Sequence, residues 1–336
     1  MAPAISILLP FHNAAATLAE ALESLLAQTF GDWELLTVDD RSDDGSAGIV
    51  AGFARRDSRV RLMVNAGPPG IVGALQTAAK GAAADWLARM DADDCCHPER
   101  LARQWERAGA GAGEVDVVAT DVDLIDPLGE GMTRYVAWAN SLETHEAIAN
   151  ARFIENPVIH PTVLMRRRAF DAVGGYREVP WAEDHDLWLR MLQHGARFAK
   201  VTERLLAWRD SADRLTRSDG RYHEKARQQM RAHFLSALPA VREQGVVIAG
   251  AGPIGKSLAR GLLALGITVH GFFDVHPRRL GETIHGAEVA GLGDFGHRWR
   301  DAVLLSAVGL AGVREEIRQL AADAGYGEGR DFWCIC

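Results

Sequence analysis

The sequence predicts an α/β protein with two domains, each built on a mostly parallel sheet. In the first part of the chain, strand-like apolar runs alternate with segments of helical periodicity, a pattern typical of βαβ units. The pattern restarts near residue 246, after a polar link that Pro239 interrupts. A chain of 336 residues is long enough for two domains. We therefore predict a larger domain over residues 1–238 and a smaller one over residues 245–336.

The first domain begins with four strands separated by helices. The strand-like runs are residues 4–10, 33–38, 60–64 and 85–90, and the helical segments between them cover about 14–28, 46–56 and 71–83. The first run is apolar almost throughout, as expected of a parallel strand buried on both faces. The remaining pattern predicts helices over 98–108, 183–194 and 217–238, strands over 115–119 and 158–165, two short strands over 198–208, and an irregular stretch over 121–150.

The smaller domain repeats the strand–turn–helix pattern. We expect strands over 246–249, 267–274 and 302–308, and helices over about 254–265 and 313–324. A glycine-rich turn at 250–255 joins the first strand to the first helix. A unit of roughly 90 residues is small but can fold alone.

Composition and charge exclude several classes of protein. The formal net charge is −8, whereas a nucleic-acid-binding protein would present a basic face. No apolar run reaches the ~18 residues of a membrane-spanning helix, and the first residues lack a signal-peptide pattern. The four cysteines contain no Cys-x-x-Cys pair, which disfavours a structural zinc site and fits reduced thiols. We therefore expect a cytoplasmic protein, with peripheral contact at the inner membrane face left open.

Acidic side chains follow two of the predicted strands. Asp91, Asp93 and Asp94 come directly after the fourth strand, and Asp39 and Asp40 come after the second. Ligands of open α/β sheets bind outside the carboxyl ends of the strands, and crowded carboxylates repel unless a cation such as Mg²⁺ or Mn²⁺ neutralises them. A solvated turn or helix capping is the structural alternative for each group. Their recurrence at two strand ends favours a nucleotide cleft, with Asp94 expected to anchor the turn.

Three further segments carry candidate functional side chains. Glu183 and Asp184 open a helix, where the helix dipole stabilises acids anyway, and either could serve as a general base. His160 lies between two prolines and either approaches the metal, lines the cavity or is structural. Arg209 follows a tryptophan and could clamp a diphosphate, whereas the arginines downstream of it are equally typical of a solvated surface.

A set of short motifs occurs in order along the first part of the chain. The motifs are residues 7–13, 28–30, 38–46, 88–94, 98–101 with Gln104, 160–162, 174–177, 183–190 and 208–209. Each is weak alone, but their order and spacing are specific. Together they resemble a family 2 glycosyltransferase, up to about residue 235. The chain departs from the family at 76–79, which lacks a common Asn-x-Gly, and at His185, where Tyr is more usual.

This resemblance implies a GT-A fold and an inverting transfer from a nucleotide-sugar, commonly a UDP-sugar, to a hydroxyl of a glycan or lipid-linked glycan. It implies Asp184 as the general base, with Glu183 beside it, and Mn²⁺ or Mg²⁺ as the cofactor. The implied metal ligands are Asp91, Asp93 and His160. The implied donor nucleotide site consists of Pro10, Phe11, His12, Asn13, Asp39, Asp40, Arg89, Asp91 and Arg209.

The smaller domain carries a phosphate-binding pattern of its own. Gly250, Gly252 and Gly255 fit Gly-x-Gly-x-x-Gly after a strand, and Asp274 ends the next strand, as in dinucleotide-binding domains. The residues that follow the third glycine also satisfy a P-loop pattern. We favour a Rossmann-like domain because of the acid and because no Walker B strand follows. The region resembles the small nucleotide-binding domain ahead of bacterial sugar acyltransferases, and we expect it to bind a nucleotide or to keep only the fold for docking.

Two functions of other classes remain open at this point. A regulatory or scaffold protein would bind a nucleotide-sugar without turnover, which the intact acids disfavour. An NAD(P)-dependent oxidoreductase would be centred on the C-terminal domain, which leaves no catalytic subdomain to hold a substrate. The sequence does not specify the sugar, the acceptor, the linkage or the oligomeric state.

Overall fold

The computed structural model describes residues 2–109, 115–212 and 214–336. The chain divides into two compact units. The first contains residues 1–148, 158–179 and 183–217, and the second contains residues 149–157, 180–182 and 218–336. By compactness the division therefore falls upstream of the link around Pro239, and the border predicted there stays a sequence prediction. None of the described helices is long and apolar enough to cross a membrane.

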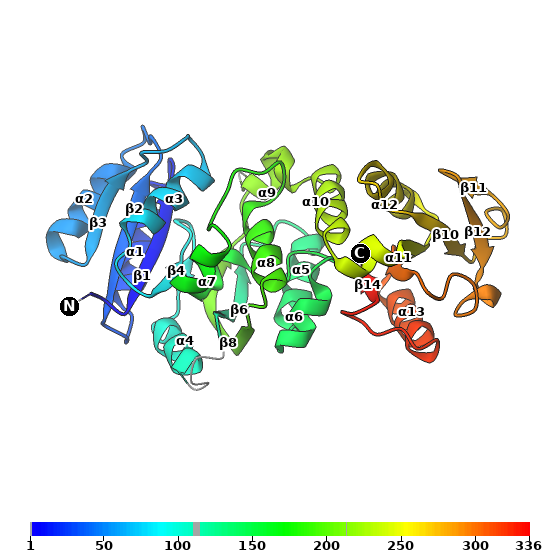
Figure 1. Cartoon of the computed structure of the whole chain (residues 1–336). Coiled ribbons are helices and arrows are strands. Elements are labelled where there is room, and N and C mark those ends of the chain that lie inside the picture. The colour runs from blue at the N-terminus through cyan, green and yellow to red at the C-terminus, as the bar shows by residue number, and fades with distance from the viewer. Residues whose placement is uncertain (1, 110–114, 213) are drawn as a thin grey trace. The chain divides into compact units, whose positions relative to one another are not determined.

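Within the described residues, the first unit is organised around an eight-stranded mixed sheet (Figure 1). The strand order is β3–β2–β1–β4–β7–β6–β8–β5. The bounds are β1 (Ile5–Phe11), β2 (Trp33–Asp39), β3 (Val60–Val64), β4 (Trp86–Arg89), β5 (Cys95–Cys96), β6 (Val117–Ile125), β7 (Leu164–Arg166) and β8 (Phe198–Arg209). The first four strands pair in parallel, whereas β7 runs antiparallel to both β4 and β6.

Both faces of this sheet are covered, which explains the continuous apolar run in β1. Ile5, Ile7 and Leu9 pack into one cluster, and Leu8 packs into another. Successive side chains of a strand point to opposite faces, so a strand buried on both sides needs apolar residues throughout. The helices of this part of the chain are α1 (Leu18–Leu26), α2 (Ser46–Arg56), α3 (Ile71–Gly81), α4 (Arg100–Gly109), α5 (Glu130–Asn140), α6 (His145–Ala151), α7 (Arg167–Ala172), α8 (Glu183–Gln193) and α9 (Leu215–Ser218).

Several segments differ from the sequence prediction. The two short strands expected over 198–208 form one strand, β8, whose pairing with β6 shifts register around Thr120–Val122. The strand expected over 158–165 is a 3₁₀ turn, His160–Thr162, followed by the short β7. Pro161 lacks the N–H that a ladder needs, which accounts for the turn. The stretch over 121–150, predicted to be irregular, contains the end of β6, all of α5 and most of α6.

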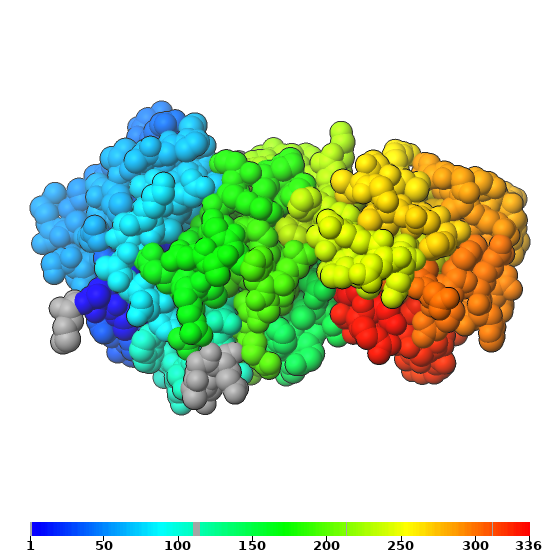
Figure 2. All heavy atoms as spheres, viewed as in Figure 1, coloured from blue at the N-terminus to red at the C-terminus, as the bar shows by residue number. Residues whose placement is uncertain are grey.

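The second unit holds a six-stranded sheet in the order β11–β12–β10–β9–β13–β14 within the described residues. The strands are β9 (Val246–Ala249), β10 (Val269–Asp274), β11 (Thr283–Ile284), β12 (Ala287–Gly291), β13 (Val303–Ser306) and β14 (Phe332–Cys334). The helices are α10 (Glu224–Ser236), α11 (Pro239–Gln244), α12 (Pro253–Ala264) and α13 (Ala311–Asp323). All pairs are parallel except β11 with β12. Figure 2 shows residues 246–336 of this unit as spheres, in yellow to red.

The polar helix expected over 217–238 is interrupted. It consists of α9, a 3₁₀ turn (Gly220–Tyr222) and α10, because the Asp219 side chain accepts a hydrogen bond from the Arg221 N–H and starts a new turn. Helix α10 packs against α12 in the second unit. Their approach is close, since a Cβ on Gly261 would lie 2.9 Å from the Cβ of Ala232.

Candidate active site

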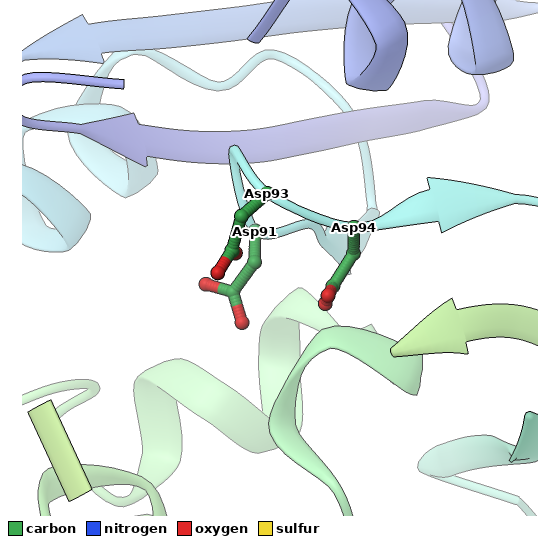
Figure 3. A group of neighbouring side chains, drawn as sticks. All are labelled: Asp91, Asp93 and Asp94. Atoms are coloured by element: carbon green, nitrogen blue, oxygen red, sulfur yellow. The ribbon is translucent and has the colours of Figure 1, made fainter. Parts of the chain in front are cut away.

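Three aspartates on the loop after β4 form a cluster of carboxylates. Asp91, Asp93 and Asp94 each offer an oxygen, and these oxygens all lie within 4.8 Å of one another. Figure 3 shows the three carboxylates on the same side of the loop, with Asp94 nearest the next strand. The clustering follows from the sequence spacing, because a tight turn brings residues three apart onto one side.

The electrostatics of this cluster fit a divalent cation. Burial raises the pKa of Asp94 well above its ordinary value, and the charges of Asp91 and Asp93 act in the same direction. Burial and Asp91 also raise the pKa of Asp93. Asp94 is fully buried and its Oδ2 has no hydrogen-bond partner among the described residues. A buried carboxylate oxygen without a donor beside two further acids is the arrangement that Mg²⁺ or Mn²⁺ stabilises.

Asp94 therefore does more than the sequence predicted for it. Its Oδ1 accepts a hydrogen bond of 2.9 Å from the backbone N–H of Arg209, which ties the end of β8 to the loop, as expected of an anchoring residue. The same carboxylate is a member of the cluster, and its Oδ2 has no hydrogen-bond partner among the described residues. The pattern Asp-x-Asp-Asp alone does not distinguish an anchor from a ligand, because both roles depend on the tertiary position of Arg209.

Arg89 lies directly beneath the cluster at the end of β4. Its side chain is 1% exposed, and its guanidinium pairs with the Asp91 carboxylate. Burial opposes the charged form of Arg89, but Asp91 more than compensates and holds the pKa of the guanidinium above its ordinary value. Arg89 thus orients Asp91 from below. Its predicted contact with the donor nucleotide stays a prediction.

The predicted nucleoside segments lie side by side because β1 and β2 are parallel neighbours. Pro10 and Phe11 pair with Val38 and Asp39 in the sheet. Beyond the strand ends, His12 Nδ1 lies 2.8 Å from the carbonyl oxygen of Asp40. The two loops are also joined through Asn13. Its N–H donates to Ser42 Oγ at 3.0 Å, and its Oδ1 accepts from the Asp43 N–H at 2.9 Å.

Asp39 and Asp40 have different environments. Asp40 Oδ1 accepts a hydrogen bond from Asn65 Nδ2 at 2.6 Å, and its Oδ2 accepts one from the Gly70 N–H at 2.6 Å. Both of its oxygens therefore hold the loop before α3. Asp39 Oδ1 accepts from the Ser42 N–H at 2.9 Å. Of the two acids, Asp39 is the better placed to offer a second oxygen to a ligand.

The candidate base residues lie at the N-terminus of α8. Glu183 and Asp184 are 1% and 9% exposed, and Asp184 Oδ1 accepts a hydrogen bond of 2.7 Å from the His185 N–H. One turn further, the buried Asp186 accepts hydrogen bonds from Arg177 and Arg190, which fixes the start of the helix. The first turn of α8 thus combines a structural acid with two acids in partly enclosed positions.

Tyr176 lies close to both groups of acids. Burial raises the pKa of its phenol, and the carboxylates of Glu183, Asp184 and Asp91 act in the same direction, against the opposing charge of Arg89. The Tyr176 hydroxyl lies 2.7 Å from His160 Nε2. The charges of the carboxylate cluster and of the acids at the start of α8 therefore both act on this phenol. In the sequence, Tyr176 appears only as part of the motif 174–177, without a role of its own.

His160 is a neutral, buried residue. Burial lowers the pKa of its imidazole well below the ordinary value, and the charge of Arg89 adds to this. The ring packs edge-on against Trp188 at 5.9 Å between centroids. His160 is not part of the group of mutually close ligand atoms formed by the three aspartates. With Nε2 bonded to Tyr176, its proposed contact with a metal stays a prediction.

Two arginines after β8 border the carboxylate cluster. Arg209 Nε donates to the Asp93 carbonyl oxygen at 3.0 Å, and its other nitrogens pair with Asp126 and Glu20. Arg214 stacks over the Trp208 ring at 4.1 Å, and its charge opposes the rise in the pKa of Asp93. Arg214 is therefore a cation near the cluster, whereas the sequence left it open between a phosphate-binding and a surface role. Stacking on Trp208 holds its guanidinium beside the end of β8.

Comparison with known proteins agrees with this geometry. Residues 6–174 match the family model described as Glycosyl transferase family 2. A Bacillus subtilis (strain 168) protein named as a glycosyltransferase, EpsE, is 31% identical over 224 residues, which cover 66% of this chain and 78% of EpsE. The Escherichia coli enzyme WfgD, a UDP-Glc:alpha-D-GlcNAc-diphosphoundecaprenol beta-1,3-glucosyltransferase, is 38% identical over 100 residues, 30% of this chain and 39% of WfgD.

Solved structures show the same fold. TarS 1–349 of S. aureus in complex with UDP superposes with a TM-score of 0.53 at 18% identity, over 77% of this chain and 70% of TarS 1–349. The mannosyltransferase PcManGT of Pyrobaculum calidifontis, in complex with GDP-Man and Mn²⁺, gives a TM-score of 0.53 at 18% identity, over 79% and 69% of the two chains. The fold is of the GT-A type, as the sequence predicted. The matched residues, 6–174, include both acidic strand ends, and the chain belongs to glycosyl transferase family 2.

Proposed function

We propose that this protein is an inverting, metal-assisted transferase that moves a sugar from a nucleotide-sugar, most simply a UDP-sugar, to a hydroxyl of a glycan or lipid-linked glycan. The observation that carries this is the cluster of Asp91, Asp93 and Asp94 beside the nucleoside loops, with one buried oxygen of Asp94 left without a donor. A cation held there would neutralise the diphosphate of the donor and of the departing nucleoside diphosphate.

Each of the following residues would have its own role in this reaction. Asp39 and the loop after Phe11 hold the nucleoside, and Arg89 keeps Asp91 in position. Asp184 accepts the proton of the acceptor hydroxyl as its oxygen forms a bond to the anomeric carbon. The bond from that carbon to the diphosphate oxygen breaks, and its electron pair leaves with the nucleoside diphosphate. Attack from the face opposite the leaving group inverts the anomeric configuration.

The names of related proteins support the substrate classes. TarS was solved with UDP and with UDP-GlcNAc, and WfgD is named for a UDP-glucose donor and a lipid-linked acceptor. ExoO of Rhizobium meliloti (strain 1021) is named for succinoglycan biosynthesis, and this chain matches 35% of its length. We therefore propose a role in polysaccharide biosynthesis. A lipid-linked acceptor would place the protein at the inner membrane face by peripheral contact.

The metal assignment is tested with Asp93→Asn, which keeps the shape of the side chain. Nucleoside diphosphate release is measured over a panel of UDP-sugars with Mn²⁺ or Mg²⁺, and metal affinity is measured by calorimetry. We expect metal affinity to fall by at least about tenfold, as losing a group at a metal site commonly does. The matched control is Asp171→Asn, an exposed acid on α7. Equal turnover and equal metal affinity in wild type and Asp93→Asn would remove the metal site.

The base assignment is tested separately with Asp184→Asn. General-base catalysis typically contributes about 10²–10⁴-fold, so kcat for transfer to the acceptor should fall by that order, whereas donor binding should not change. Glu183→Gln is measured alongside, because the two acids are neighbours. Full transfer by Asp184→Asn together with loss in Glu183→Gln would move the role to Glu183. Donor binding without turnover in wild type, across the whole panel, would favour a regulatory protein.

For the C-terminal unit, we propose a Rossmann-like domain that binds a nucleotide. Its support is the glycine-rich turn between β9 and α12, which lies at the carboxyl end of a parallel sheet.

A further inference from the structure

The C-terminal unit contains a cavity of about 450 Å³ at the start of α12. We call it the α12 pocket. Its lining residues are Ala251, Gly252, Pro253, Lys256, Ser257, Arg260 and Arg279. A volume of this order is within the range of small-molecule sites. The residues that line the pocket lie outside residues 6–174, which the family model matches, so the transferase motifs do not account for it.

The lining of the α12 pocket is cationic. Lys256 and Arg260 lie one turn apart on the same face of α12, and Arg279 comes from the segment after β10. No carboxylate is among the lining residues, and neither Lys256 nor Arg260 has an ion-pair partner among the described residues. Arg279 is paired with Asp274 at 2.8 Å, whereas Lys256 and Arg260 are like charges without such a partner in the described part of the chain, and a multiply charged anion would offset the repulsion between them.

Asp274, the acid at the end of β10, is held by donors from the glycine turn and from the segment after β10. Its Oδ2 accepts hydrogen bonds from the Ala251 N–H at 2.9 Å and from Arg279 Nη1 at 2.8 Å, and its Oδ1 accepts one from the His276 N–H at 2.8 Å. Despite the opposing effect of burial, these donors lower the pKa of the carboxyl group. Three donors occupy the two carboxylate oxygens, and one of them, Arg279, lines the α12 pocket. Asp274 holds the glycine turn in place and orients the guanidinium of Arg279.

The three glycines of the turn also have different roles. A Cβ on Gly255 would lie 2.0 Å from the Gly250 carbonyl oxygen, and Gly250 has a φ of +108°, so both are required by the backbone. Gly252 has a φ of −78°, which any residue adopts, and a Cβ there would meet nothing within 4 Å. The backbone gives no reason for a glycine at 252. The open space in front of it is part of the α12 pocket.

We propose that the α12 pocket binds the diphosphate group of a nucleoside diphosphate or nucleotide-sugar, with Lys256, Arg260 and Arg279 as its cations. The phosphates would approach the backbone at Gly252, at the positive end of α12. This specifies the nucleotide proposed above for the C-terminal unit and does not depend on the transferase activity. NAD is the competing ligand, because Asp274 ends β10 at the position where a dinucleotide site holds its ribose-binding acid.

The proposal is tested by calorimetry on the full chain in EDTA, with UDP, inorganic pyrophosphate and NAD as separate ligands. The variants are Gly252→Ala, which fills the phosphate position without straining the backbone, and the double variant Lys256→Ala/Arg260→Ala. Because a charge-assisted hydrogen bond is worth more than a neutral one, we expect UDP affinity to fall by at least about tenfold in each variant. Arg278→Ala, an exposed cation of the same segment outside the lining, is the matched control and should keep wild-type affinity.

The ligands separate the sources of the diphosphate. Tighter binding of UDP than of pyrophosphate, lost in both variants, supports a nucleoside diphosphate. Equal binding of the two would overturn the nucleoside part, and NAD binding tighter than UDP would overturn the choice of ligand. Unchanged UDP affinity in both variants, with unchanged melting temperatures, would overturn the site itself. If the protein turns over no donor but its UDP affinity still falls in the two variants, the transferase proposal fails and the proposal for the α12 pocket stands. The failure of one proposal is therefore distinguishable from the failure of the other.

Discussion

At the scale of single residues, the centre of the site is a buried Tyr–His pair with acids on either side. The Tyr176 hydroxyl and His160 Nε2 are 2.7 Å apart, and both groups are buried. The phenol packs against Phe170 with ring centroids 5.3 Å apart. Because neither partner reaches water, each depends on the other to satisfy its hydrogen bond. The pair therefore fixes the space between Asp91 and the start of α8.

The Tyr176→Phe variant should expose this dependence. It keeps the ring and leaves the His160 nitrogen without its partner, so the free energy of unfolding should fall by about 1–3 kcal/mol, as measured by urea denaturation. In the double variant Tyr176→Phe/His160→Phe no orphaned group remains, and the combined loss should be smaller than the sum of the two single losses. Strictly additive losses would show that the two side chains contribute independently.

The carboxylate cluster gives a second residue-scale prediction, which concerns the metal. In EDTA, Asp94→Asn removes a buried charge that has an unpartnered oxygen and two like-charged neighbours, so stability should rise by about 1–3 kcal/mol. Mn²⁺ at about 100 times its Kd should stabilise the wild type by about 2.7 kcal/mol. The variant should gain less, because it has lost a ligand. Urea unfolding with and without Mn²⁺ measures both effects. The prediction is contradicted if Asp94→Asn is less stable than wild type in EDTA and is stabilised by Mn²⁺ as much as wild type is.

At the scale of elements, Glu34 joins three segments of the first sheet. Its Oε1 accepts hydrogen bonds from Ser6 Oγ and the Ala83 N–H, both at 2.7 Å, and its Oε2 pairs with Arg61 at 2.8 Å. These donors connect β1, β2, β3 and the segment after α3. Burial opposes ionisation of Glu34, but the donors dominate and lower the pKa of the carboxyl group below its ordinary 4.5.

This network predicts a pH dependence of stability. Since the pKa of Glu34 is lower in the folded chain, the unfolded chain binds more protons between the two values, and stability rises with pH there. The contribution is complete above the ordinary value of 4.5 and is lost as pH falls through the folded value. In Glu34→Gln this part of the acid limb should be absent when unfolding is followed from pH 3 to 7. An identical profile in wild type and variant would refute the role of Glu34.

Individual elements also show which parts of the fold and of the site could be predicted from the sequence. Strands β1, β2 and β9 were predictable because each is a mostly apolar run, and the acids at the ends of β2 and β4 were found because strand ends are where such residues signal function. The continuous β8 was not predictable, because its pairing with β6 depends on a register shift. The sequence shows Tyr176 only as part of the motif 174–177 and leaves Arg214 open between a phosphate-binding and a surface role, because a buried partner and a stacked ring are tertiary contacts that no local pattern encodes.

At the scale of the whole molecule, compactness and sequence pattern place the border between the units differently. The sequence breaks at Pro239, but α10 packs against α12 and belongs with the C-terminal unit. Arg231 on α10 donates to the carbonyl oxygens of Phe153 and Ile154, which belong to the same unit. The C-terminal unit is thus completed by segments that precede the link, and one of them lies far upstream.

Truncation after residue 238 should therefore leave an incomplete surface on α10. The face of α10 that carries Ala232 would lose α12, which lies so close that a Cβ on Gly261 would be 2.9 Å from the Ala232 Cβ. Met230, Phe234 and Leu235 are buried in the full chain, and exposing apolar side chains of this size costs about 1.5–3 kcal/mol each to the extent that they become solvated. We expect residues 1–238 to bind more of an apolar dye and to unfold at a lower urea concentration than the full chain.

Replacing the apolar residues of α10 by polar ones in the truncated chain should reduce the dye binding, whereas the same replacement in the full chain should destabilise it. If residues 1–238 match the full chain in dye binding and in unfolding midpoint, the border at the link is the correct one and α10 belongs to the transferase unit.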